Sequence, residues 1–190
     1  MRALRTWLWL AALGVLSATV PAWSADVAGV DMVEKAKLAG RDVVLSGAAI
    51  RTRAFFKIYV VGLYLPQKAT SAEAALSQTP RRIEIVLLRN VSANQFVDAL
   101  NEGLRDNSSP AELDAIEPQV DQLMSIIRSF KEARDRDVVT LDYVDNATLI
   151  GFKGENRGSI AGEAFNRALM RIWLGDKPVQ PNIKQALLGG

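Results

Sequence analysis

The sequence contains no cysteine and no histidine. These absences exclude disulfides, thiol nucleophiles, zinc fingers and every mechanism in which an imidazole acts as the base or as a metal ligand. The acidic residues are not clustered in a loop, as a site for a hard cation requires. We therefore expect neither a metal nor another cofactor, and redox, zinc and serine-hydrolase functions are poor candidates.

An excess of charge of one sign is also lacking. The chain has 23 Lys and Arg residues against 21 Asp and Glu residues, a formal net charge of +2 over 190 residues. The surplus consists of Arg2 and Arg5, so the chain beyond them is formally neutral. Binding to nucleic acid relies on clustered cations, and no long basic run is present. The sequence therefore predicts no nucleic-acid partner.

The amino-terminal residues have the pattern of a secretory signal. Arg2 and Arg5 precede an apolar run over residues 7–20, which small residues of a cleavage site follow. A membrane span needs about 20 apolar residues, and this run is shorter. We predict a cleaved signal peptide over residues 1–24 and a single mature domain over residues 25–190. The mature protein is then periplasmic or secreted, with no stable membrane span.

The remaining residues alternate between strand and helix patterns. Strands are expected at residues 27–30, 43–45, 51–65, 82–88, 138–144 and 148–152, the last two joined by a tight turn at Asp145-Asn146. Helices are expected at residues 71–76, after the capping boxes that begin at Ser92 and Ser109, from a restart near Pro118, from a cap at Ser159 to Gly175, and after Pro181. This order favours an α+β fold, a mostly antiparallel sheet covered on one face by a layer of helices.

Residues 51–65 (RTRAFFKIYVVGLYL) are the most distinctive stretch. Their β-branched and aromatic content predicts a strand. Alternation places Tyr59 and Val61 on one face and Val60 and Tyr64 on the other. Because both faces are mostly apolar, we expect an interior strand covered on both sides.

Segments along the chain resemble a known family. They are residues 45–51 (LSGAAIR), 55–65, 91–95 (VSANQ) and 172–179 (IWLGDKPV) before Leu187-Leu-Gly189. Over about residues 27–189 the chain resembles the chalcone isomerase superfamily, most closely its bacterial, exported, chalcone isomerase-like branch. The resemblance implies an antiparallel sheet backed by helices, with a ligand cleft between the two layers.

Two activities are associated with this resemblance. The plant enzymes close a chalcone to a flavanone, which needs a cation for the phenolate and hydrogen-bond donors for the developing enolate. Relatives without this activity bind fatty acids in the same cleft through an arginine and a tyrosine. Phe96 stands where the isomerases carry a tyrosine, and Gly103 where they carry an asparagine. These two departures argue against isomerase chemistry.

The resemblance also implies a set of ligand contacts. Arg51 matches the family arginine, and Arg53 is the alternative because the spacing to the next strand is shorter than in the plant enzymes. Tyr59 stands where the isomerases have threonine and the fatty-acid binders have tyrosine. Lys57 shares a strand face with Tyr59 and is a further candidate cation. Phe55, with apolar neighbours on this face, is expected to line the tail of the ligand.

Three functions from different classes follow. The first is a non-catalytic binder of a small amphipathic anion, such as a fatty acid. The second is an intramolecular lyase or isomerase acting on a phenolic enone. The third is an interaction module whose cleft is filled by its own side chains. The absence of histidine and cysteine, together with Phe96 and Gly103, favours the binder.

Overall fold

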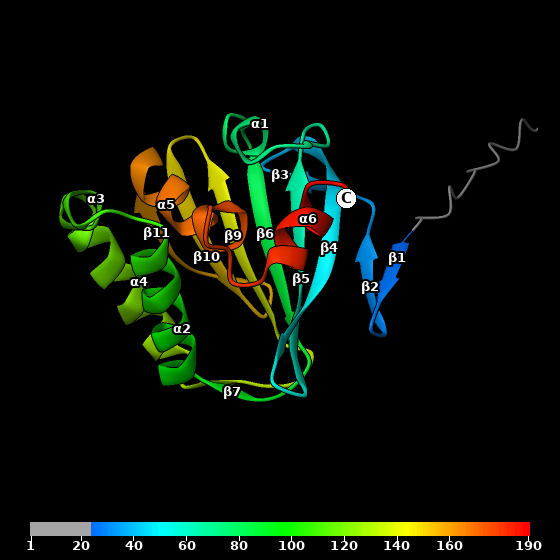
Figure 1. Ribbon diagram of the computed structural model, residues 1–190, viewed down its shortest axis with the longest axis horizontal. Coiled ribbons are helices and arrows are strands. Elements are labelled where there is room, and N and C mark those ends of the chain that lie inside the picture. Colours follow the sequence, from blue (N-terminus) through cyan, green and yellow to red (C-terminus); the bar gives the residue numbers. More distant parts are fainter. Residues whose placement is uncertain (1–23) are drawn as a thin grey trace, which may run out of the picture.

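The computed structural model describes residues 24–190, so the predicted signal peptide lies almost entirely outside the described residues. The centre of the fold is a seven-stranded antiparallel sheet (Figure 1). Its order is β11 (Glu155–Ala161), β10 (Ala147–Phe152), β9 (Val138–Val144), β6 (Arg81–Leu87), β5 (Phe56–Leu65), β4 (Arg41–Arg53) and β3 (Lys35–Leu38). Two small two-stranded sheets accompany it. One is the hairpin of β1 (Ser24–Val27) and β2 (Val30–Val33), and the other pairs β7 (Val91–Ser92) with β8 (Glu132–Ala133), which are far apart in the chain.

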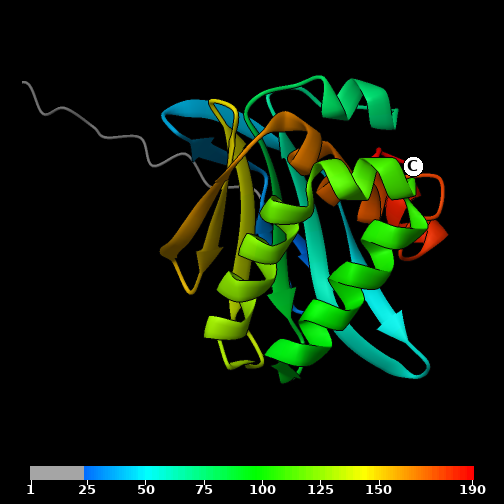
Figure 2. The same cartoon turned by 90° about the vertical axis from the view of Figure 1, so that its left-hand side faces the viewer.

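The helices form a layer on one face of this sheet, as the sequence predicted. They are α1 (Ala72–Leu76), α2 (Ala93–Asp106), α3 (Pro110–Ala115), α4 (Glu117–Ser129), α5 (Glu163–Leu174) and α6 (Pro181–Leu187). Figure 2 shows α2 and α4 lying across this face, between the sheet and the viewer. The fold is therefore α+β, and the main core lies between the sheet and the helices.

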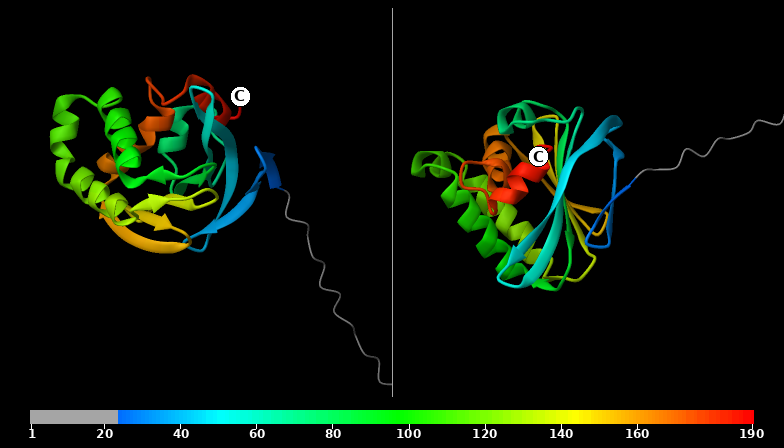
Figure 3. Two further views of the ribbon diagram at one scale, coloured as in Figure 1. Left: turned by 90° about the horizontal axis from the view of Figure 1, so that it is seen from below. Right: turned by 45° about the vertical axis from the view of Figure 1, so that its right-hand side comes forward.

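The two faces of β5 bury different clusters. Val61 and Leu63 join the core beneath the helices, whereas Val60 and Tyr64 join a second cluster on the opposite face. The hairpin of β1 and β2 covers that opposite face next to β4 and β5 (Figure 3). The predicted interior strand with two covered faces is therefore confirmed, although a strand hairpin rather than a helix covers the second face.

The local start signals of the helices are also confirmed. Ser92 and Gln95 form both bonds of a capping box at the start of α2, and Ser109 and Glu112 do the same for α3. Helix α3 ends before Pro118 and α4 begins one residue ahead of it. Each of these signals acts within a few residues, which is why the sequence alone reveals them.

Three predicted elements are wrong. Residues 27–30 are not a strand, because Ala28 and Gly29 form the turn between β1 and β2, in which Val27 pairs with Val30. Residues 51–65 are not one strand, because the chain turns at residues 54 and 55 and starts a new strand at Phe56. Ser159 does not cap a helix but pairs with Leu149 as part of β11. Helix α5 instead begins after Gly162. The sequence does not predict β11, because it is a polar edge strand without the apolar alternation that marks a buried strand.

Candidate functional site

Arg51 and Tyr59 lie side by side on neighbouring strands. They are directly opposite each other in the register of β4 and β5, and opposite residues of antiparallel strands project from the same face. This is the helical face, because Tyr59 packs against the core beneath the helices. Both side chains are half-buried. The structure therefore brings together the arginine and the tyrosine that the resemblance singled out.

The hydroxyl of Tyr59 meets a buried tryptophan. The indole Nε1 of Trp173, on α5, donates a hydrogen bond to this hydroxyl over 3.1 Å. Burial raises the pKa of Tyr59, and the bond from Trp173 and the charge of Arg51 lower it only in part. The phenol therefore keeps its proton at neutral pH. Within residues 24–190 its O–H has no acceptor, so it is free to donate to a ligand.

The guanidinium of Arg51 is held by neutral acceptors. Its Nη1 donates to the side-chain oxygen of Gln180 and to the carbonyl oxygen of Thr52, both over 3.0 Å. Among the residues that the structure describes, no carboxylate lies within ion-pair distance of Arg51. A half-buried cation without a counter-ion favours the entry of an anion, because desolvating either charge alone is costly.

Gly47 explains why Gln180 reaches this position. A Cβ atom at Gly47 would collide with the backbone carbonyl of Ala186 in α6, so the absence of a side chain lets α6 lie directly on β4. This contact brings Gln180, the residue that precedes α6, to the end of β4. There its amide oxygen also accepts a 2.8 Å bond from the backbone N–H of Thr52. The close packing of α6 on Gly47 therefore places Gln180 where its side chain orients Arg51.

The other predicted contacts lie at the end of the β4–β5 hairpin. Arg53 and Lys57 are exposed, and Phe55 is fully exposed. The prediction that Phe55 lines an apolar tail is therefore wrong, because the turn places this residue outside the interior. Of the two candidate arginines, Arg51 rather than Arg53 is the one paired with Tyr59.

The two positions at which this chain departs from the isomerases lie on α2. Phe96 is half-buried and packs against the core. A Cβ atom at Gly103 would lie 2.8 Å from the Cγ2 atom of Ile172 on α5. Position 103 is therefore a contact between two helices, with no room for an amide. Neither position offers a donor to a developing oxyanion.

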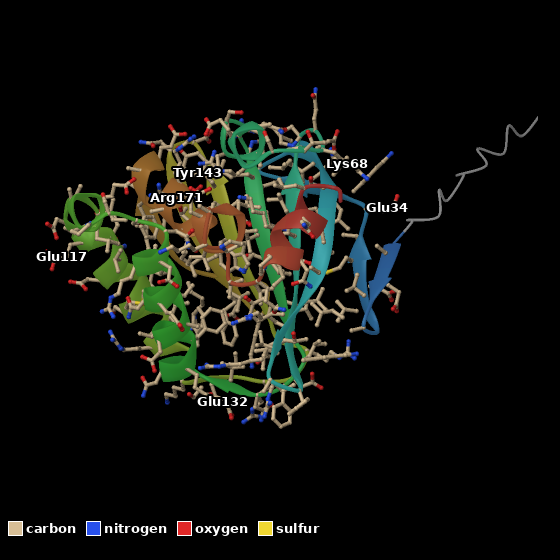
Figure 4. The ribbon with its side chains drawn as sticks, viewed as in Figure 1. Glu34, Lys68, Glu117, Glu132, Tyr143 and Arg171 are labelled. Atoms are coloured by element: carbon tan, nitrogen blue, oxygen red, sulfur yellow. The ribbon has the colours of Figure 1, made fainter. Side chains whose placement is uncertain are left out.

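A separate hollow of about 780 Å³ lies between α1, the α2–α3 connection, α5 and the start of α6. Arg171, labelled in Figure 4, lines it and pairs with Glu112 over 3.0 Å. Arg167 also lines it and pairs with Glu73 over 2.8 Å. These two cations are already neutralised, and neither Arg51 nor Tyr59 borders this hollow.

Between residues 24 and 190, no group of three or more acidic side chains is arranged to hold a metal ion. No helix in this range is long and apolar enough to cross a membrane.

Comparison with known proteins agrees with the architecture. The chalcone isomerase-like family matches residues 24–189. The chain belongs to this family. A search of curated proteins finds no significant match. Among solved structures, the chalcone isomerase-like chain is similar to a fatty-acid binding protein of Arabidopsis thaliana, with a TM-score of 0.64 and 12% identity over 84% of this chain and 92% of that one. At this identity the likeness shows the fold alone.

Sequence reasoning missed two residues that surround Arg51 and Tyr59. Trp173 lies buried in the core, and the sequence does not predict its bond to Tyr59. A buried tryptophan N–H usually finds an acceptor, and this rule was the available signal. Gln180 lies in a connecting segment, 129 residues from Arg51, and no local pattern pointed to it.

Proposed function

We propose that this chalcone isomerase-like protein is a non-catalytic binder of a small amphipathic anion, such as a fatty acid. In this proposal Arg51 and Tyr59 together hold the carboxylate. The observation that carries it is the pairing of a half-buried arginine without a carboxylate partner in residues 24–190 with a tyrosine whose O–H has no acceptor there. The fatty-acid binding protein of the same fold supports the choice of ligand.

The two side chains offer complementary donors. The Nε and Nη2 groups of Arg51 make no bond to residues 24–190, and together they can donate in parallel to the two oxygens of one carboxylate. Tyr59 adds a directed neutral donor from the same sheet face. The bond from Trp173 polarises this hydroxyl and orients it.

The hydrocarbon tail must enter the region between the sheet and the helical layer. Next to Tyr59 on the same face, Val61 and Leu63 are fully covered, whereas Phe96 on α2 is half-buried. Binding therefore requires part of the helical layer to move away from the sheet. A ligand tail replaces the lost apolar contacts as it enters.

A catalytic function is less well supported. Cyclisation of an enone needs donors aimed at the developing enolate, but Phe96 has no hydroxyl and Gly103 faces Ile172. Loss of one such donor typically raises the barrier by about 3–4 kcal/mol. We therefore expect no stereoselective flavanone formation above background in an absorbance assay.

The test is titration of oleate, below its micellar concentration, into the wild type and variants of the full chain. Arg51→Ala should lose about 2–5 kcal/mol of binding free energy, the usual cost of truncating one partner of a buried charge pair. Tyr59→Phe should lose about 1–2 kcal/mol, because it removes a neutral donor and keeps the ring. Arg53→Ala is the matched control, an exposed arginine two residues away on the same strand.

Three outcomes contradict the proposal. No binding to the wild type, or equal affinities in all variants, favours instead an interaction module with a filled interior. If Arg53→Ala loses as much affinity as Arg51→Ala, the assignment of the carboxylate to Arg51 is wrong. Circular dichroism of each variant separates a loss of binding from a loss of fold.

We further propose that the protein is exported and that cleavage removes residues 1–24, which leaves a periplasmic or secreted domain. The proposal rests on Arg2 and Arg5, the apolar run at residues 7–20 and the small residues that follow it. Amino-terminal sequencing of protein purified from its native host tests it. A chain that begins at Ala25 or Asp26 supports export, and an intact Met1 contradicts it.

A further inference from the structure

The end of the β4–β5 hairpin exposes two adjacent aromatic side chains. We call residues 53–57 the hairpin tip. Within it Phe55 is 100% exposed and Phe56 is 58% exposed. The only other large apolar side chain exposed in residues 24–190 is Val33, at 42%. A single exposed apolar residue needs no explanation, but two neighbouring phenylalanines at one protruding turn do.

The backbone holds these rings away from the protein. Arg53 pairs with Phe56, so Ala54 and Phe55 alone form the turn. Ala54 has a φ of +53°, in the left-handed region that residues with a side chain rarely adopt. Such a tight turn leaves the ring of Phe55 no surface of its own hairpin to pack against.

Three cations lie close to the two rings in the sequence or in space. Arg53 and Lys57 flank them in the sequence, and the guanidinium carbon of Arg89 lies 4.6 Å from the centre of the Phe56 ring. None of these three cations pairs with a carboxylate of residues 24–190. Glu132, labelled at the same end of the molecule in Figure 4, already pairs with Arg134 over 3.4 Å. The hairpin tip therefore combines exposed aromatic side chains with positive charges that no carboxylate of residues 24–190 neutralises.

We infer that the hairpin tip attaches this protein to the surface of an anionic lipid bilayer. Phe55 and Phe56 enter the headgroup boundary, where aromatic rings are favoured, while Arg53, Lys57 and Arg89 pair with lipid phosphates. A bilayer fits the tip better than a protein partner does. Two rings and three cations offer far less area than the roughly 800 Å² per partner of a standard protein interface.

This inference does not depend on the proposed ligand, although the two fit together. Arg51 and Tyr59 lie only two residues from Arg53 and Lys57 on the same two strands. A protein attached by the hairpin tip would therefore hold its proposed carboxylate site close to the lipid surface. This is the arrangement needed to exchange an amphipathic ligand with a membrane.

The test is co-sedimentation of the full chain with lipid vesicles that contain no free fatty acid. One set of vesicles is phosphatidylcholine with phosphatidylglycerol, and the other is phosphatidylcholine alone. Phe55→Ser with Phe56→Ser should weaken binding to the anionic vesicles by about tenfold or more. Arg53→Gln with Lys57→Gln should weaken it by about 25-fold, since each cation near an anionic surface contributes roughly fivefold. Val33→Ser is the matched control and should bind as the wild type does.

Each result supports or overturns the inference. Weakening in both tip variants, a preference of the wild type for the anionic vesicles and sensitivity to salt support it. Equal binding of all variants overturns it, because attachment then does not depend on the hairpin tip. A change of oligomeric state in the Phe55→Ser, Phe56→Ser variant without a change in vesicle binding also overturns it and indicates self-association. Equal melting temperatures exclude misfolding as the cause.

Discussion

A buried arginine offers the sharpest test of how this core is held together. Arg81 on β6 is 1% exposed. Its Nε donates to the Oδ1 of Asn166 over 2.7 Å, and its Nη1 donates to the carbonyl oxygens of Leu76 and Gln78 over 2.8 and 2.9 Å. The Nδ2 of Asn166 then donates to the hydroxyl of Thr148 over 3.0 Å. Asn166 therefore satisfies two buried groups at once.

Asn166→Leu keeps the size of the side chain but removes both of these bonds. It leaves one N–H of a buried cation and one buried hydroxyl without a partner. Leaving a buried polar group without a partner costs about 1–3 kcal/mol, so the two groups together should cost about 2–6 kcal/mol, a large fraction of a total unfolding free energy of about 5–15 kcal/mol. Replacing Arg81 as well removes the N–H donor that Asn166→Leu leaves without a partner. Arg81→Met with Asn166→Leu should therefore lose only about 1–3 kcal/mol.

Urea unfolding followed by circular dichroism measures these differences. Asn101→Leu on α2 is the control, because Asn101 makes no side-chain hydrogen bond to the described part of the chain, and it should stay within about 0.5 kcal/mol of the wild type. An Asn166→Leu variant within about 1 kcal/mol of the wild type would refute the reasoning. A double variant less stable than Asn166→Leu alone would refute it equally.

Three further predictions concern packing, charge and capping. Gly47→Ala should detach α6 from β4, because its Cβ collides with the backbone of Ala186, and native hydrogen exchange should show faster exchange of the α6 amides. Burial raises the pKa of Glu84 above its ordinary value of 4.5. The ionised carboxylate therefore destabilises the fold at neutral pH, but not below pH 4.5, where the carboxyl is protonated in the folded and the unfolded state alike. Glu84→Gln should therefore raise the melting temperature at neutral pH, and a gain that persists below pH 4.5 would contradict this cause. Ser92→Ala should lower the unfolding free energy by about 1 kcal/mol in urea, because it removes the amino-terminal cap of α2, whereas an unchanged stability would show that tertiary contacts alone hold this end.

Much of the fold could be predicted because its signals are local. The turn at Asp145-Asn146 has φ values of 49° and 61°, which the hairpin geometry requires and which these two residue types tolerate. Ser159 shows the limit of this reasoning. Its type and position are those of a helix cap, but pairing with Leu149 on β10 holds it in a strand. That pairing depends on the closed β9–β10 hairpin, which no short window contains.

The candidate site could likewise be predicted from the sequence only in part. The sequence alone determined the chemical types on β4 and β5, the alternation that puts Tyr59 and Val60 on opposite faces, and the absence of side-chain donors at Phe96 and Gly103. Only the tertiary structure decided which arginine faces Tyr59, because the register of the hairpin depends on where the chain turns. It also decided that Arg51 is held by neutral partners. The contact comes from Gln180, 129 residues away, and it forms only once α6 docks on a strand that has no side chain in its path.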